Sequence, residues 1–146
     1  MIAITLCNLG CRKVIATDIE QVIENTKLNI QKNINQGDYE VLKLEWDNDD
    51  DINKINTIDI LVCCELLYKE APWEKLLSTI NKLTKMNKNL EIIFAYKKRY
   101  MLQELFITEL AKEYQIEYIP KSQFHEEFQL TDDFIIFKAK LLFYVY

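Results

Sequence analysis

The chain has 146 residues, 49% hydrophobic and 28% charged, which is enough to bury a core and is not the composition of a disordered segment. Its net charge of −5 argues against a nucleic-acid backbone as the main partner, because binding phosphates requires clustered Lys and Arg, and better suits a basic, lysine-bearing protein. No apolar stretch reaches the roughly 18–20 residues of a membrane span, so we expect one globular domain that does not bind a membrane.

The first half of the chain alternates between helix and strand patterns. The expected elements, in chain order, are a helix at Met1–Leu9, a strand at Val14–Thr17, a helix at Glu20–Asn33, a turn at Asn35–Asp38 and a strand at Tyr39–Trp46. Gly10 could end the first helix in the left-handed conformation, and a strand at Ile2–Cys7 is the alternative. The acidic run Asp47–Asp51 lacks the glycine and spaced glutamate of a calcium loop, which favours a solvated loop.

The second half continues the alternation. The expected elements are a strand at Ile58–Cys64, a helix from Pro72 to about Met86, a strand at Leu90–Tyr96, a helix at Tyr100–Tyr114, a short strand at Ile116–Ile119 and a long strand at Phe134–Tyr146 with a bend or loop inside it. This order predicts an α/β fold, with a largely parallel sheet and helices on both faces. The last two strands, joined without a helix, predict an antiparallel C-terminal edge.

The strand at Ile58–Cys64 is apolar on both faces, as expected at the centre of a helix-covered sheet. Ligands of open α/β sheets bind beyond the carboxyl ends of such strands, where this chain has Glu65 and, three residues later, Tyr68. A carboxylate and a phenolic oxygen on one turn could hold an amine between them. A capping glutamate and a packed tyrosine are the alternative.

Two residues in the first half are candidates for binding a nucleoside. Asp18, at the end of a strand, could accept hydrogen bonds from both ribose hydroxyls of an adenine-containing cofactor, or it could cap the following helix. Trp46 closes the next strand, and its indole could stack on an adenine or belong to the core.

The remaining reactive side chains favour structural roles. The adjacent cysteines Cys63 and Cys64 must point to opposite faces of their strand, which disfavours a shared metal site. We expect all four cysteines to be reduced, no metal to be bound, and the protein to reside in the cytosol or nucleus, since no secretory signal is visible. The basic run Tyr96–Arg99 suggests a solvated loop, and His125 a surface or capping residue.

Taken together, these segments resemble the seven-strand (class I) S-adenosylmethionine-dependent protein-lysine methyltransferases, in particular the branch that methylates valosin-containing protein, an AAA ATPase. The resemblance covers nearly the whole chain. Its segments are Leu9–Gly10 with Val14–Glu20, Leu28–Ile30 with Asn33, Val41–Lys43 up to Trp46, Asp59–Leu61 with Glu65 and Tyr68, Ala95–Tyr96 with Arg99, Glu117–Pro120, His125–Phe128 and Asp133–Ile136.

The resemblance implies a Rossmann-like sheet, S-adenosylmethionine as cofactor, and a protein substrate such as an AAA ATPase or a chaperone. It implies that Asp18 holds the ribose, that Trp46 flanks the adenine and that Cys64 also lies at the cofactor. Glu65 and Tyr68 then form the family's acidic-x-x-Tyr motif, at the entrance for the substrate lysine.

One part of the family pattern is missing. The first strand and its glycine-rich cofactor loop precede the position of Gly10, and this chain has only one other glycine, Gly37. We therefore expect an N-terminally incomplete methyltransferase domain that lacks the first strand, with two apolar sheet edges exposed. The alternative function is an inactive methyltransferase-like fold that serves as a structural or protein-binding subunit, with a partner chain covering those edges.

Overall fold

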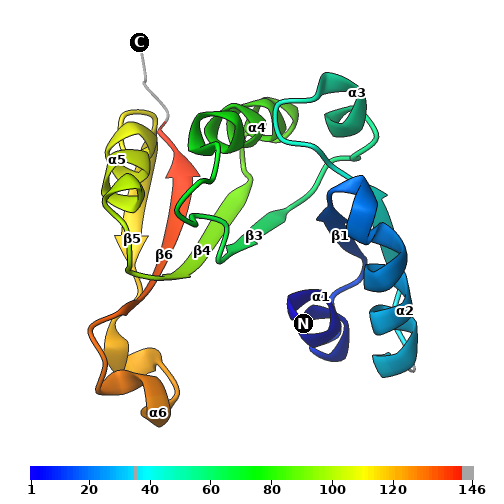
Figure 1. The fold of residues 1–146 in the computed structure, drawn as a ribbon, viewed down its shortest axis with the longest axis horizontal. Helices are drawn as coiled ribbons and strands as arrows, with labels where there is room; N and C mark the ends of the chain where they lie inside the picture. Colours follow the sequence, from blue (N-terminus) through cyan, green and yellow to red (C-terminus); the bar gives the residue numbers. More distant parts are fainter. Residues whose placement is uncertain (35, 143–146) are drawn as a thin grey trace. The chain divides into compact units, whose positions relative to one another are not determined.

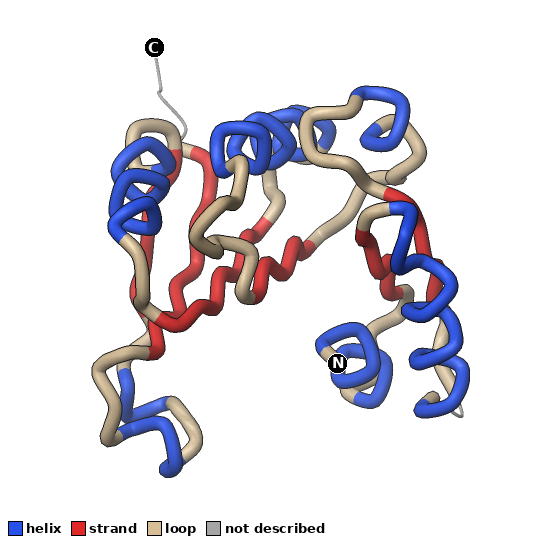
Figure 2. Tube along the Cα trace, in the orientation of Figure 1, coloured by secondary structure: helices blue, strands red, loops and turns tan. Residues whose placement is uncertain are grey.

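The computed structural model describes residues 1–34 and 36–142. Helices and strands alternate along them, which confirms the α/β class expected from the sequence (Figures 1 and 2). The chain divides into two compact units, Met1–Ile55 and Asn56–Tyr146, and the single domain expected from composition stays a prediction. Asn35 of the expected turn and residues 143–146 of the expected final strand lie outside the described residues.

The first unit is built on a β-α-β step. Its elements are α1 (Ile2–Asn8), β1 (Val14–Asp18), the 3-10 helix η1 (Glu20–Val22), α2 (Ile23–Asn33), β2 (Tyr39–Lys43) and α3 (Asp49–Ile52). Strands β1 and β2 pair in parallel, from Val14 opposite Tyr39 to Asp18 opposite Lys43, and η1 and α2 form the connection between them. β2 is shorter than expected, because the chain enters a turn that is closed by the bond from the Asn48 amide to the Glu45 carbonyl.

The N-terminal segment is helical, so the alternative of a strand at Ile2–Cys7 is wrong. Gly10 ends α1 with φ +81°, a conformation that glycine adopts without steric cost. The Gly10 amide donates to the carbonyl of Cys7 at 3.0 Å, and the Cys11 amide donates to that of Leu6 at 3.2 Å. These two bonds form a complete Schellman motif, the C-terminal cap that the sequence predicts.

The second unit contains a four-stranded sheet. Its elements are β3 (Ile60–Cys64), α4 (Trp73–Met86), β4 (Glu91–Lys97), α5 (Met101–Leu110), β5 (Tyr114–Tyr118), the 3-10 helix η2 (Lys121–Gln123), α6 (Glu126–Gln129) and β6 (Phe134–Leu141). The strand order is β3-β4-β6-β5, with β3 parallel to β4 and β6 antiparallel to both of its neighbours. The antiparallel pairing at the C-terminal end is confirmed.

Two sequence expectations about this unit are wrong. Helix α5 ends at Leu110 rather than Tyr114, because Tyr114 opens β5 and pairs with Leu141 of β6. The connection from β5 to β6 is not free of helix, since η2 and the short α6 lie within it. His125 is the N-cap of α6 and its Nδ1 accepts from the Glu127 amide at 3.4 Å, which confirms the expected capping role.

Helices α4 and α5 lie on the same face of the four-stranded sheet (Figure 1). Under them, Phe94 of β4 is 1% exposed and its ring lies 5.2 Å from that of Phe106 and 5.1 Å from that of Phe137. The other buried apolar residues of this core include Leu76, Ile80, Leu83, Leu90, Ile92, Tyr96, Leu110 and Ala139. The arrangement of helices on both faces of one continuous sheet stays a prediction, because the six described strands form two separate sheets.

The acidic run is not a solvated loop throughout. Asn48 caps α3 by accepting from the Asp51 amide at 3.1 Å, and the Asp51 side chain is only 2% exposed. Its carboxylate accepts from Lys54 Nζ at 2.8 Å and from the Glu45 amide at 3.1 Å, with Lys43 Nζ also at 3.1 Å. These contacts, the Lys54 bond foremost, lower the pKa of the Asp51 carboxyl. Asp51 therefore closes the turn after β2.

Candidate functional site

The candidate nucleoside-binding residues lie at one edge of the first unit. Asp18 ends β1 and pairs in register with Lys43, the last residue of β2. The Leu44 amide donates to the Asp18 carbonyl at 2.9 Å, which continues the strand pairing by one step. Because carboxyl ends of parallel strands share an edge, Asp18 and the turn after β2 lie at the same end of the sheet.

The Asp18 side chain is exposed, and its Oδ1 accepts from the Ile19 amide at 2.9 Å. It does not cap a helix: the N-cap of η1 is Ile19, without a side-chain cap bond, and that of α2 is Val22. The capping alternative is therefore wrong. An exposed carboxylate at this edge remains able to accept hydrogen bonds from a ligand hydroxyl.

Trp46 lies in the turn that follows β2 and is half-buried rather than part of the core. The turn is tight, since the Asn48 amide donates to the Glu45 carbonyl at 3.1 Å and Asp47 adopts φ +69°. The bond from the Glu45 amide to the buried Asp51 fixes the residue directly before Trp46. The backbone of this turn is thus fixed, and the half-buried Trp46 keeps surface on which a planar ring could stack.

The candidate acceptor residues follow β3 in the second unit. Cys63 is 2% exposed, and burial raises the pKa of its thiol to about 12. Cys64 is less buried; burial again is the main cause that raises its thiol pKa. Both thiols are therefore protonated and unreactive near neutral pH. All four cysteines are free.

Glu65 is the most constrained residue of the candidate site. Its backbone has φ +54°, a left-handed conformation that is uncommon outside glycine. The Glu65 amide donates to the Ala95 carbonyl at 2.9 Å. Its carboxylate accepts from the Lys97 amide at 2.6 Å and from Arg99 Nη1 at 2.9 Å. These contacts hold the chain in a strained conformation of a kind that is concentrated at functional sites.

Tyr68 completes the motif on the same loop. Its side chain is 52% exposed, while Leu67 beside it is 3% exposed and anchors the loop in the core. The Tyr68 carbonyl accepts from the Ala71 amide at 2.9 Å, which closes a turn before α4. Glu65 and Tyr68 are therefore both available at the surface of one short, anchored loop.

Arg99 and Gln103 also belong to this site, although the sequence predicted a solvated loop at Arg99 and Gln103 was not among the residues singled out from it. The expected solvated loop at Tyr96–Arg99 is instead tied down: Lys98 pairs with Glu104 at 2.9 Å, and Arg99 pairs with Glu65. Gln103 is buried and bonds to both loops. The spacing of Gln103 from Tyr100 is that of a capping box, but tyrosine is not a usual N-cap residue, so the signal is weak.

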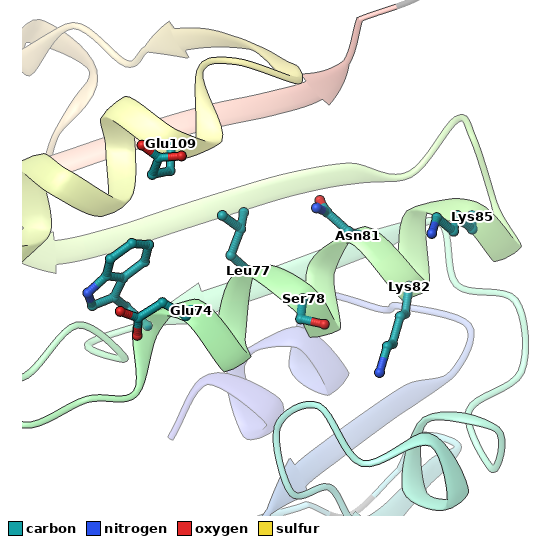
Figure 3. A pocket seen from close by; sticks show the side chains of 8 residues that line it. Glu74, Leu77, Ser78, Asn81, Lys82, Lys85 and Glu109 are labelled. Carbon is teal, nitrogen blue, oxygen red and sulfur yellow. The ribbon is translucent and has the colours of Figure 1, made fainter.

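The surface hollow along α4 does not coincide with the predicted residues. A hollow of about 440 Å³ lies along α4 and is lined by Trp73, Glu74, Leu77, Ser78, Asn81, Lys82, Lys85 and, from α5, Glu109 (Figure 3). None of the predicted site residues lines it. Within residues 1–34 and 36–142, no cluster of three or more His, Cys, Asp or Glu side chains is placed to hold a metal ion. No helix in that part of the chain is long and apolar enough to cross a membrane.

Comparison with known proteins gives two findings. A family model described as "lysine methyltransferase" matches residues 1–113. Among solved structures, the chain is similar to precorrin-8w decarboxylase of Methanobacterium thermoautotrophicum, with 14% sequence identity and a TM-score of 0.57 over 97% of this chain and 75% of that one. The second likeness shows the fold alone, and together with the first it confirms the expected Rossmann-like fold.

Proposed function

The chain belongs to the lysine methyltransferase family, and from that premise we propose that it transfers methyl groups from S-adenosylmethionine to a lysine side chain of a protein substrate. Membership of the family implies a methyl donor of this type. The observation that assigns the proposed function to particular residues is the strained backbone of Glu65. Glu65 lies on an exposed loop directly beyond a parallel strand, and its carboxylate is bound by the Lys97 amide and by Arg99. Such a position is where α/β sheets bind their ligands.

The donor is assigned to Asp18, Trp46 and Cys64. The exposed Asp18 carboxylate fits the ribose hydroxyls, and the half-buried Trp46 indole fits the adenine ring, so the described residues suit the adenosine part of the donor. Cys64, half-buried at the end of β3, is assigned to the cofactor by family resemblance. For the methionine part of the donor, this chain offers no glycine-rich loop, because its two glycines, Gly10 and Gly37, lie far apart in the sequence. Bound S-adenosylmethionine supplies an electrophilic methyl group on its sulfonium.

Glu65 and Tyr68 are assigned to the acceptor. The lysine must present a neutral amine, although its ordinary pKa is about 10.4, so one proton has to pass to solvent before the amine attacks the methyl group. Forming the N–C bond would break the bond between the donor's sulfur and its methyl group, so the donor would leave as the neutral thioether. The Glu65 carboxylate would attract and orient the incoming ammonium, while the Tyr68 phenol would accept a hydrogen bond from it. Holding the amine in line with the methyl group provides most of the rate enhancement. The reaction itself needs no metal.

The substrate we propose is a cytosolic or nuclear AAA ATPase, with valosin-containing protein as the first candidate. This assignment comes from the sequence segments that contain Glu65, Tyr68 and Arg99, and the net charge of −5 suits a lysine-bearing surface. Mass spectrometry of purified candidate substrates after incubation with this chain and S-adenosylmethionine would identify any methylated lysine. A panel of AAA ATPases and chaperones without any new methyl group would exclude this substrate class.

Cofactor binding is the direct test of the function. Isothermal titration of the full chain with S-adenosylmethionine should give saturable binding that Asp18→Ala weakens. Glu24→Ala is a matched control, because it removes one carboxylate from an exposed face of α2, where Glu24 pairs with Lys27 of the same helix. If the wild-type chain does not bind the donor, the enzymatic function is wrong.

A second candidate is favoured by the sheet edges. Within the described residues, β1 pairs only with β2, and β3 pairs only with β4, so each strand leaves one edge unpaired. Ile60 on β3 is 54% exposed, an arrangement that invites strand addition. A methyltransferase-like subunit whose partner chain covers these edges would protect the amides of β3 from hydrogen exchange only when the partner is present. A monomer that binds and transfers the methyl group without any partner would exclude this role.

A further inference from the structure

Gln103 is a buried polar residue that joins two segments. Its side chain is 2% exposed and lies in the first turn of α5. Its Nε2 donates to the Leu67 carbonyl at 3.0 Å and to the Lys97 carbonyl at 3.1 Å. Its Oε1 accepts from the Arg99 amide at 2.9 Å and from the Tyr100 amide at 3.2 Å. Every donor and acceptor site needed for a buried amide is therefore used.

Of the two segments joined by Gln103, one is the loop that carries the acidic-x-x-Tyr motif and the other is the end of β4. Leu67 precedes Tyr68 in the loop after β3, which we call the acceptor loop (Glu65–Tyr68). Lys97 ends β4 and Arg99 follows it. The acceptor loop is thus fastened at both ends: Glu65 reaches the Lys97 amide at 2.6 Å, and Gln103 reaches the peptide before Tyr68.

We propose that Gln103 is a positioning residue for substrate binding, whose amide fixes the acceptor loop and thereby the placement of Tyr68. The inference rests on the proposed function for its effect on methyl transfer, but the fastening of the loop can be tested without it. Glutamine suits the position because one planar group both donates to two carbonyls and accepts from two amides. A carboxylate in the same place would turn an oxygen toward the carbonyls of Leu67 and Lys97.

The test compares Gln103→Glu with Thr84→Val in the full chain. Thr84 is a matched control: it is 1% exposed, its hydroxyl donates to Ile80 and accepts from Tyr114, and none of these contacts involves the acceptor loop. Both substitutions remove bonds of a buried polar group. Hydrogen exchange of peptides spanning the acceptor loop, the KM for a lysine-bearing acceptor peptide and the Kd for S-adenosylmethionine are measured for both.

Gln103→Glu should raise the exchange rate of the acceptor loop and the acceptor KM by roughly tenfold each, the change expected when the loop loses its one hydrogen bond from Gln103, at the Leu67 carbonyl. The Kd of the Gln103→Glu variant for S-adenosylmethionine should stay within about twofold of the wild-type value. Thr84→Val should change neither the exchange rate of the acceptor loop nor the acceptor KM. If Gln103→Glu does not fold, Gln103→Met, of similar length and without charge, is measured in the same way.

Equal loop exchange in the Gln103 and Thr84 variants would overturn the proposal. So would a faster-exchanging loop with an acceptor KM equal to that of Thr84→Val, since Gln103 would then be only a structural residue. A wild-type chain that binds neither donor nor acceptor would refute the proposed function instead, and the loop exchange would still decide whether Gln103 fastens the loop.

Discussion

Replacing Glu65 with glutamine should separate its contribution to stability from its contribution to methyl transfer. Glutamine keeps an oxygen that can accept from the Lys97 amide, but it cannot pair with Arg99. The two paired side chains are 44% exposed in Glu65 and 47% in Arg99. Ion pairs this exposed contribute about 0.2–1 kcal/mol to the free energy of unfolding.

The expected effects differ in size. For a unit as small as Asn56–Tyr146, a loss of 1 kcal/mol lowers the melting temperature by about 4–8 °C, so Glu65→Gln should lower it by no more than about 8 °C. A hydrogen bond to a charged group contributes about 1.5–3 kcal/mol. If Glu65 holds the substrate ammonium, kcat/KM should therefore fall by roughly 10- to 150-fold.

Differential scanning calorimetry and methyl transfer to a lysine peptide measure the two effects. Glu109→Gln is the matched control, since Glu109 pairs with Lys112 on the surface of α5 and its side chain is 40% exposed. Equal activities of the Glu65 and Glu109 variants would refute the role of Glu65 at the acceptor. A fall in melting temperature well beyond about 8 °C would refute the reasoning from its exposure.

Three further predictions concern the donor site, a pH dependence and the core. Trp46→Ala should weaken S-adenosylmethionine binding by roughly 5- to 150-fold in isothermal titration, as expected for the loss of one stacked base. Asp51→Asn should lower the free energy of urea unfolding at pH 7. Because the folded-state pKa of Asp51 is lowered, its carboxylate stabilises the protein above the unfolded pKa of about 3.9, and this difference should shrink as the pH falls below that value. Phe106→Ala should cost about 3–5 kcal/mol in thermal unfolding, since its ring is fully buried 5.2 Å from that of Phe94.

Each of these has a control on the same element or unit. Glu24→Ala should leave donor binding unchanged, and a similar loss in both variants would contradict a stacking role for Trp46. Asp50→Asn removes an exposed carboxylate from α3, and its effect should not depend on pH as that of Asp51→Asn does. Leu105→Ala truncates a residue of α5 that is 53% exposed, and a cost equal to that of Phe106→Ala would refute the packing argument.

Elements set by local chemistry were predictable from the sequence. Gly10 marks the end of α1 because only a left-handed residue completes the two cap bonds there. The β-branched run beginning at Val14 predicts β1, and Pro72, with its fixed φ, predicts the start of α4 one residue later. In each case the deciding interaction lies within a few residues of the signal.

Elements decided by contacts between residues far apart in the chain were not predictable from the sequence. Tyr114 continues a helical pattern, yet it begins a strand, because it pairs with Leu141 and its hydroxyl bonds to Asn81 and Thr84 of α4. Asp51 lies in a run of acidic residues, and such a run predicts a solvated loop. Its burial depends on cations at two separate positions, which composition alone does not reveal.

The candidate site divides in the same way. Glu65 and Tyr68 follow an apolar strand, so their position at its carboxyl end could be predicted. The partners of Glu65 come from 32 and 34 residues further along the chain, and Gln103 reaches Leu67 across 36 residues. A single sequence carries no pattern for such pairs.

The position of β6 between β4 and β5 has a consequence for the order of folding. During synthesis, β5 emerges before β6, but it has no partner until the last strand inserts beside β4. Most strand pairs of the second unit therefore form only after Phe134–Leu141 has left the ribosome. Pairings this distant in sequence close slowly, so β4 and β5 pass through a period with open edges in which association with other nascent chains competes with folding. A chain terminated before Phe134 would remain in that state.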